Sequence, residues 1–189
     1  MNVQTTIKRV LIVAAVSLNF IAPAHAQEWT LTPQTYVGFE IKSMGFSKVK
    51  GKFEQVQSSM NFDPEMPQNA SAQFALDINS LSLNKPSLKN MILGKDLFYA
   101  EKYPIATFKS HEFIVLSNHH YSIKGDLTLR GITQPVTLDT VLKPNPANPK
   151  LLDVQSKAVV NRSDFGMKKA FGGIGEKVNI EVEGHWKTR

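Results

Sequence analysis

The sequence predicts an all-β fold, an antiparallel β-barrel with one short helical insertion. Apolar and polar residues alternate with a period of two along most of residues 27–189, as they do in strands that bury one face. Turn-forming pairs such as Asp63-Pro64 and Ser117-Asn118 separate the alternating runs. Only residues 85–103 depart from this rhythm. Many consecutive antiparallel strands form a closed barrel or a two-sheet sandwich, and the sandwich is the alternative.

Residues 1–26 are expected to be a cleaved signal peptide. Lys8 and Arg9 precede an apolar run that ends at Ile21, and residues 24–26 (AHA) place small residues around a cleavage position. The run is too short for a transmembrane helix, which needs ~20 apolar residues. An anchor helix that stays attached is the alternative. We therefore expect a periplasmic protein whose single domain spans residues 27–189.

The expected strands number eight or slightly more. In chain order, their apolar positions fall within residues 29–31, 37–41, 49–62, 72–78, 106–115, 121–129, 136–142, 152–160 and 178–186. Within 49–62 the apolar set changes from odd to even numbers at Glu54–Gln55, which predicts a β-bulge. Long, bulged strands favour a barrel, because closure removes the edge strands and bulges supply the bend.

The segment that breaks the alternation predicts a short helix. Pro86 suits the first helical position, Leu88, Met91 and Ile92 share one face, and Gly94 can end the helix.

The hairpin over residues 125–139 (GDLTLRGITQPVTLD) has alternating apolar residues on both sides of its turn. Gly131 and Pro135 are expected to shape that turn. Arg130 and Asp126 share the outer face, so we expect them to pair there or with Arg162 and Asp164.

The composition gives little support to catalysis. The chain has no cysteine, which excludes thiol chemistry, thiolate metal sites and disulfides. Its formal net charge of +6 is mild and does not indicate a nucleic-acid partner. No nucleophile or metal-binding motif is present, and the histidines are expected at the surface without a metal. The glycine-rich stretch 168–175 lacks the features of a phosphate loop and is expected to be a connection. We expect no enzyme activity and no cofactor.

Large apolar side chains dominate the inward positions, and the chain has eleven phenylalanines against two tryptophans. An eight-stranded barrel has an interior that is either filled by its own side chains or able to hold one small ligand. A cavity lined by these residues would be lipophilic.

Five motifs follow one another along the chain: residues 45–53 (GFSKVKGKF), residues 79–81 (NSL), residues 96–98 with 102–110, residues 125–138, and residues 161–167 (NRSDFGM). Together and in this order they resemble the YceI-like family of exported polyisoprenoid-binding proteins. The resemblance covers residues 28–187. It implies a lipocalin-like, extended eight-stranded antiparallel β-barrel whose hydrophobic tunnel holds an isoprenoid chain, such as a quinone tail or polyprenyl lipid. Polar positions of the family pattern are replaced at Thr35, Ser43 and Asn90–Leu93, so the family's histidine contacts to a head group are not expected.

From the alternation and the resemblance, we predict a periplasmic carrier for a lipophilic, isoprenoid-type molecule, with transient membrane contact. The alternatives are a stress-protective or interaction module with a self-filled core, and a lipid-modifying hydrolase that depends on His111 or His119. The predicted tunnel lining is Phe39, Ile41, Phe53, Phe74, Leu76, Phe108, Tyr121, Ile123 and Leu127, with Phe165, Met167 and Phe171 at its mouth.

Overall fold

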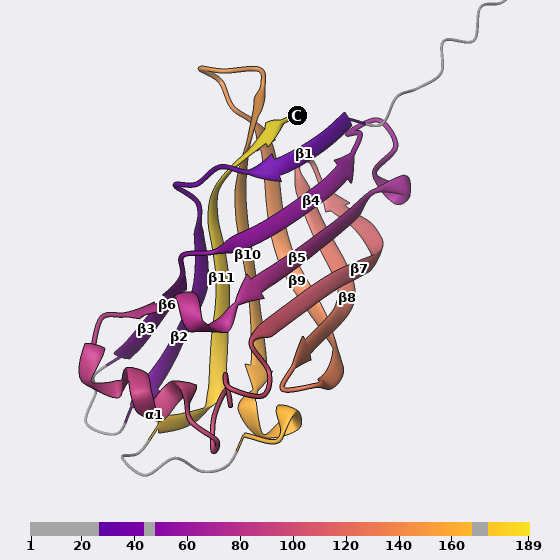
Figure 1. The fold of residues 1–189 in the computed structure, drawn as a ribbon. Helices are drawn as coiled ribbons and strands as arrows, with labels where there is room; N and C mark the ends of the chain where they lie inside the picture. The colour runs from indigo at the N-terminus through magenta and orange to yellow at the C-terminus, as the bar shows by residue number, and fades with distance from the viewer. Residues whose placement is uncertain (1–26, 44–47, 168–173) are drawn as a thin grey trace, which may run out of the picture.

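A single antiparallel sheet closes on itself in the computed structural model, which describes residues 27–43, 48–167 and 174–189 (Figure 1). The strands are β1 (Gln27–Leu31), β2 (Tyr36–Ser43), β3 (Lys48–Phe53), β4 (Val56–Phe62), β5 (Ser71–Asp77), β6 (Leu81–Leu83), β7 (Ile105–Ser117), β8 (His120–Leu129), β9 (Ile132–Pro144), β10 (Leu151–Asn161) and β11 (Ile174–Thr188). The expected signal peptide and Phe171 lie outside the described residues.

The barrel closes through the pairing of β1 with β11. Around the barrel the strands follow the order β1-β4-β5-β7-β8-β9-β10-β11, and β2, β3 and β6 continue the sheet from β11. Both arrangements are possible because β11 has 15 residues, of which the last pair with β1 and the earlier ones with β2. The structure thus confirms the eight-stranded antiparallel barrel.

The change of parity at Glu54–Gln55 marks a break between two strands, so the predicted β-bulge is wrong. β3 lies between β2 and β6, whereas β4 lies between β1 and β5. The two halves of this run therefore have different partners. A bend between them changes the side on which alternate residues lie, as a bulge would.

The helical insertion has the predicted position. A 3-10 turn at Pro86–Leu88 leads into α1 (Lys89–Leu93), and Gly94 follows the last helical residue. In Figure 1, α1 lies at the lower end of the barrel, beside the ends of β2 and β11. Within the described part of the chain, no helix has both the length and the apolar character that crossing a membrane requires.

The β8–β9 hairpin corrects two expectations. Its turn consists of Arg130 and Gly131 alone, with φ of 54° and 73°, as a two-residue hairpin turn of type I′ requires. Pro135 lies within β9, opposite Asp126, and does not shape the turn. Arg130 donates hydrogen bonds to the carbonyl oxygens of Lys95 and Leu97 and so does not pair with Asp126.

Two clusters of buried apolar residues form the core. The larger cluster fills the barrel between β1, β4 and β7–β11 and includes Trp29, Phe62, Phe108 and Trp186. The smaller one joins the extension and the helical insertion, and includes Phe39, Phe53, Ile92 and Leu97. Leu76 and Leu129 pack against both clusters. The interior therefore has two ends with different surroundings.

Candidate functional site

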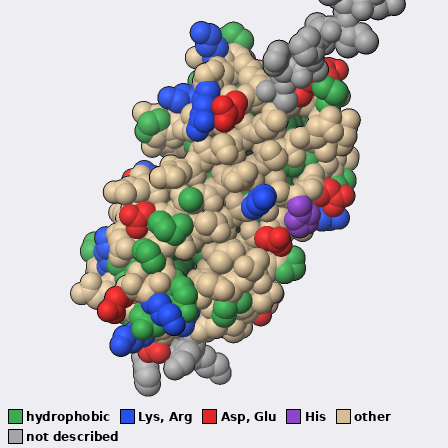
Figure 2. Space-filling model, turned by 45° about the vertical axis from the view of Figure 1, so that its right-hand side comes forward, with side chains coloured by type: hydrophobic (Ala, Val, Ile, Leu, Met, Phe, Trp, Pro, Cys, Tyr) green, Lys and Arg blue, Asp and Glu red, His purple; other side chains and the backbone are tan. Residues whose placement is uncertain are grey.

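An apolar cavity of about 110 Å³ lies at the end of the barrel that carries α1. Strands β2, β3, β5, β8, β10 and β11 form its wall together with the helical insertion. Figure 2 shows hydrophobic side chains gathered at this lower end among acidic and basic ones. The cavity is lined by Val37, Gly38, Phe39, Ile41, Phe53, Leu76, Ile92, Leu97, Phe98, Leu127, Leu129, Val160, Arg162, Phe165, Met167, Ile174, Val178 and Ile180.

Seven of the predicted lining residues lie on this wall. They are Phe39, Ile41, Phe53, Leu76, Leu127, Phe165 and Met167. Four others, Phe74, Phe108, Tyr121 and Ile123, belong to the larger core cluster instead. The predicted set is therefore divided between an open end and a filled end of the barrel.

Aromatic rings fill the other end of the barrel. Phe74 packs against Phe108 and Trp186, with ring centroids 6.2 Å and 5.6 Å apart, and Phe62 packs edge-on against Tyr121 at 5.6 Å. The space left beside Phe74, Phe108 and Trp186 is about 10 Å³. That volume is too small to hold more than a single water, so this end is a packed core.

The layer of Phe74 and Phe108 lies beneath the residues that line the cavity without contributing to that lining, and we call this layer the floor. Phe108 lies directly opposite Phe74 on one side and Leu127 on the other, and Leu127 lines the cavity. The ring of Phe108 lies over Gly125, where a Cβ atom would come within 2.5 Å of it. Gly125 thus leaves room for this ring.

The helical insertion supplies cavity residues that the strand pattern did not reveal. Ile92, Leu97 and Phe98 close one side of the cavity, and Phe98 packs against Phe39 and Phe53 at 6.0 Å and 6.1 Å. The helical spacing of this segment predicted an apolar face. It did not indicate which strands that face would cover.

Arg162 is the one charged residue among the described residues that line the cavity, and only 4% of it is exposed. Its Nε donates to the carbonyl of Gly175 at 2.9 Å, and its Nη2 lies 3.8 Å from a carboxylate oxygen of Glu176. A further contact reaches the carbonyl of Met167 at 3.5 Å. The guanidinium therefore joins the end of β10 to the start of β11.

Arg130 holds the helical insertion against the barrel through its two bonds to the carbonyls of Lys95 and Leu97. We expect Arg130→Asn to leave the turn intact, since asparagine tolerates positive φ, while removing both bonds. The backbone amides of Tyr99 and Ala100, which bond within the insertion, should then exchange with solvent about tenfold faster. Hydrogen exchange by NMR measures this, and Arg189→Ala, which removes the ion pair between Arg189 and Glu28, is the control. Unchanged rates in Arg130→Asn would contradict the role of Arg130.

The lysines of β3 are paired with carboxylates, two of them across the sheet and one within the same segment. The carboxylate of Glu40 lies 2.7 Å from the Nζ of Lys48 and 3.4 Å from that of Lys50, and Lys52 pairs with Glu54 at 2.7 Å. The hydrogen bond from Lys48, with smaller contributions from Lys50, lowers the pKa of Glu40 even though burial opposes this. Each of these lysines therefore has a carboxylate partner, and the three lysines exceed the two carboxylates by one positive charge.

The pairing of Glu40 predicts a pH dependence of stability. Because its pKa is lowered on folding, the carboxylate stabilises the fold above its ordinary pKa of 4.5, and this contribution is lost as the pH falls through the lowered value. Glu40→Gln should therefore reduce the urea midpoint at pH 7, and the difference from the wild type should shrink steadily below pH 4.5. A difference that stays constant down to the acid transition would disprove this.

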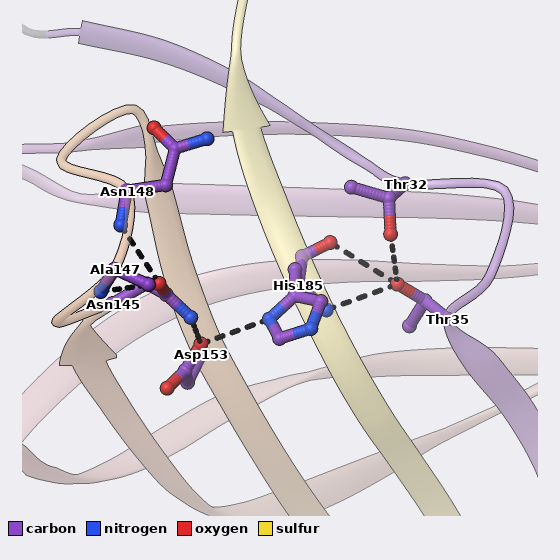
Figure 3. Close-up of polar contacts among 7 residues, drawn as sticks. All are labelled: Thr32, Thr35, Asn145, Ala147, Asn148, Asp153 and His185. Carbon is purple, nitrogen blue, oxygen red and sulfur yellow. Dashed lines mark hydrogen bonds and ion pairs between the residues drawn. The ribbon is translucent and has the colours of Figure 1, made fainter.

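Two histidines pair with aspartates on the barrel surface. His120 contacts Asp139 at 2.7 Å, and His185 contacts Asp153 at 2.8 Å. Asp153 also accepts a hydrogen bond from Asn145, while Thr35 bonds the backbone of His185 (Figure 3). Within the described residues, no three histidine, aspartate or glutamate side chains are grouped as a metal site would need. Both pairs hold strands and loops together.

Known proteins are similar to this chain in sequence, and others are similar to it in fold. The chain is 30% identical over 154 residues to a UPF0312 protein of Photorhabdus laumondii, covering 79% of this chain and 80% of that protein. It is also 30% identical over 139 residues to a UPF0312 protein of Vibrio cholerae, covering 72% of each.

Two solved structures show the same fold at low sequence identity. Burkholderia cenocepacia BcnA superposes with a TM-score of 0.74 at 24% identity, covering 82% of this chain and 98% of BcnA. A polyisoprenoid-binding domain of Saccharophagus degradans, implicated in plant cell wall breakdown, has a TM-score of 0.66 at 12% identity, covering 87% and 100%. The YceI-like domain matches residues 29–186 of this sequence. The chain belongs to the YceI-like family.

Proposed function

We propose that this protein is a periplasmic carrier that binds a lipophilic, isoprenoid-type molecule, such as a quinone or polyprenyl lipid, in the cavity beneath the helical insertion. The observation that carries the proposal is the chemistry of the cavity wall, where apolar side chains surround a single, already bonded arginine. Such a wall binds by burial of apolar surface, at roughly 25 cal/mol per Å². Membership of the YceI-like family and the fold shared with a polyisoprenoid-binding domain support this.

The size of the cavity limits how much of the ligand it holds. An engineered apolar cavity of roughly 150 Å³ in another protein accommodates benzene. The cavity here is about 110 Å³, so it holds about one isoprene unit. The filled end of the barrel is what a self-filled module would have, but the open end is not. We therefore favour a binding protein that holds the end of a prenyl chain.

The periplasmic location is part of the proposal and rests on the charged, apolar and small-residue regions of the first 26 residues. Fractionation of cells that express the full chain tests it directly. Recovery in the periplasm, with a mature N-terminus at Gln27, is expected. Recovery of uncleaved protein with the membrane fraction would favour the anchor helix.

Binding is tested by filling the cavity. Val160 lines it, whereas the neighbouring Val159 points outward and is 61% exposed. We expect Val160→Trp to weaken the binding of geraniol at least tenfold in calorimetric titration, and Val159→Trp to leave it unchanged. Organic extraction of the natively purified wild type, followed by mass spectrometry, should release a prenyl species. A wild type that is empty and binds no prenyl alcohol would refute the function.

A further inference from the structure

A second hollow opens in the barrel wall beside the cavity. The ladder between β2 and β3 ends at the pair Gly38 and Lys52. The separate ladder between β1 and β4 ends at the pair Trp29 and Met60. Between these points, residues 30–37 and 53–59 form no ladder with each other. The interruption leaves a cleft of about 560 Å³.

The cleft differs from the cavity in chemistry. Its lining combines apolar residues, such as Leu31 and the half-exposed Ile105, with polar ones. The exposed side-chain amides of Gln55 and Gln57 make no hydrogen bond to any described residue, so they can bond a ligand. A surface of this mixed kind suits a polar group that is attached to an apolar chain.

The cleft and the cavity share part of their walls. Val37 and Phe53 line both, so a partition one side chain thick separates the two spaces. The ring of Phe53 packs against Phe39 at 6.2 Å and Phe98 at 6.1 Å, and lies beside the open space of the cavity.

We propose that the lateral cleft is the head-group subsite of the ligand, and that the chain passes between Val37 and Phe53 into the cavity. The inference rests on the proposed function. It also accounts for the small size of the cavity, because only the chain end has to fit inside.

The charges along the cleft select the kind of head group. Lys52 is paired with Glu54 at 2.7 Å, and Asp77 adds a second carboxylate. A carboxylate or phosphate head would therefore meet a lining that is negative on balance, while a hydroxyl or carbonyl head would meet free amides. The ligand is an amphiphile with an uncharged, hydrogen-bonding head.

Three compounds with related ten-carbon acyclic chains test this: geraniol carries a hydroxyl, geranic acid a carboxylate, and myrcene no head group. Wild-type protein should bind geraniol about tenfold more tightly than geranic acid at pH 7. Gln57→Trp, which fills the cleft from an exposed position, should weaken geraniol about tenfold and leave myrcene unchanged. Gln155→Trp, at an exposed position of β10, is the matched control and should change neither.

The outcomes separate the two proposals. If no compound binds the wild type, the proposed function fails. If geraniol and myrcene bind but Gln57→Trp weakens neither, or if geranic acid binds as tightly as geraniol, the cavity function stands and the head-group subsite is refuted. Equal loss of myrcene and geraniol in Gln57→Trp would also refute it, because the cleft would then control the chain alone.

Discussion

Replacing Phe108 with alanine is expected to lower the free energy of unfolding by about 3–5 kcal/mol, the usual cost of truncating a packed phenylalanine. Phe108 is 7% exposed, and its ring fills the space between Phe74 and Gly125. The strands around it cannot collapse into the vacated volume, because their registers are held by ladders on both sides. Urea denaturation at pH 7 measures the loss.

The matched variant is Phe98→Ala at the open end. Phe98 already borders empty space, so its ring has fewer packing partners to lose, and it lies on the insertion. We expect Phe98→Ala to lower the free energy of unfolding by less than half as much as Phe108→Ala does. Equal losses in the two variants would show that the two ends of the barrel are packed alike, and would contradict their division into a cavity and a core.

The sequence did not predict this division of the barrel interior into a cavity and a packed core. The alternation placed Phe39 and Phe74 alike on the inner face of the barrel, because a period of two specifies the side of a strand and nothing about depth along the barrel axis. Whether a given depth is filled depends on rings that meet across the interior, such as Phe74 and Trp186. Those residues are distant in sequence, and no local pattern records their contact.

The predicted bulge and the predicted partner of Arg130 were wrong for the same reason, because both depend on contacts between residues that are distant in sequence. The parity change at Glu54–Gln55 correctly indicated that the chain changes sides, but a bulge and a strand break leave the same pattern. Which of them occurs is decided by the partners of β3 and β4, which come from elsewhere in the chain. Likewise, the contact of Arg130 with Lys95 and Leu97 depends on where the helical insertion packs. The barrel itself was predictable because closure follows from many strands that each carry the same signal.

The floor of the cavity should determine how long a chain the protein accepts. Phe74 belongs to that floor, and on β5 it lies two residues from Leu76, which lines the cavity. Phe74→Ala would join the vacated volume to the cavity, making room for roughly one more isoprene unit. Each buried CH₂ contributes ~0.8 kcal/mol, and part of that gain is offset by ordering the chain. We therefore expect farnesol to bind Phe74→Ala about tenfold more tightly than it binds the wild type, with geraniol little changed.

The control for chain length is Phe113→Ala, which truncates a ring of the same filled core outside the layer of Phe74 and Phe108. Phe113 packs against Phe62 at 6.5 Å, so its removal creates a separate void. Calorimetric titration of both variants with geraniol and farnesol distinguishes the two cases. If Phe113→Ala favoured farnesol as strongly as Phe74→Ala did, the gain would reflect a loosened core, and Phe74 would not set the length of the chain. A gain confined to Phe74→Ala would show that the aromatic layer beneath the cavity sets the length of the bound chain. Only in that layer does the loss of a ring extend the space that the chain already occupies.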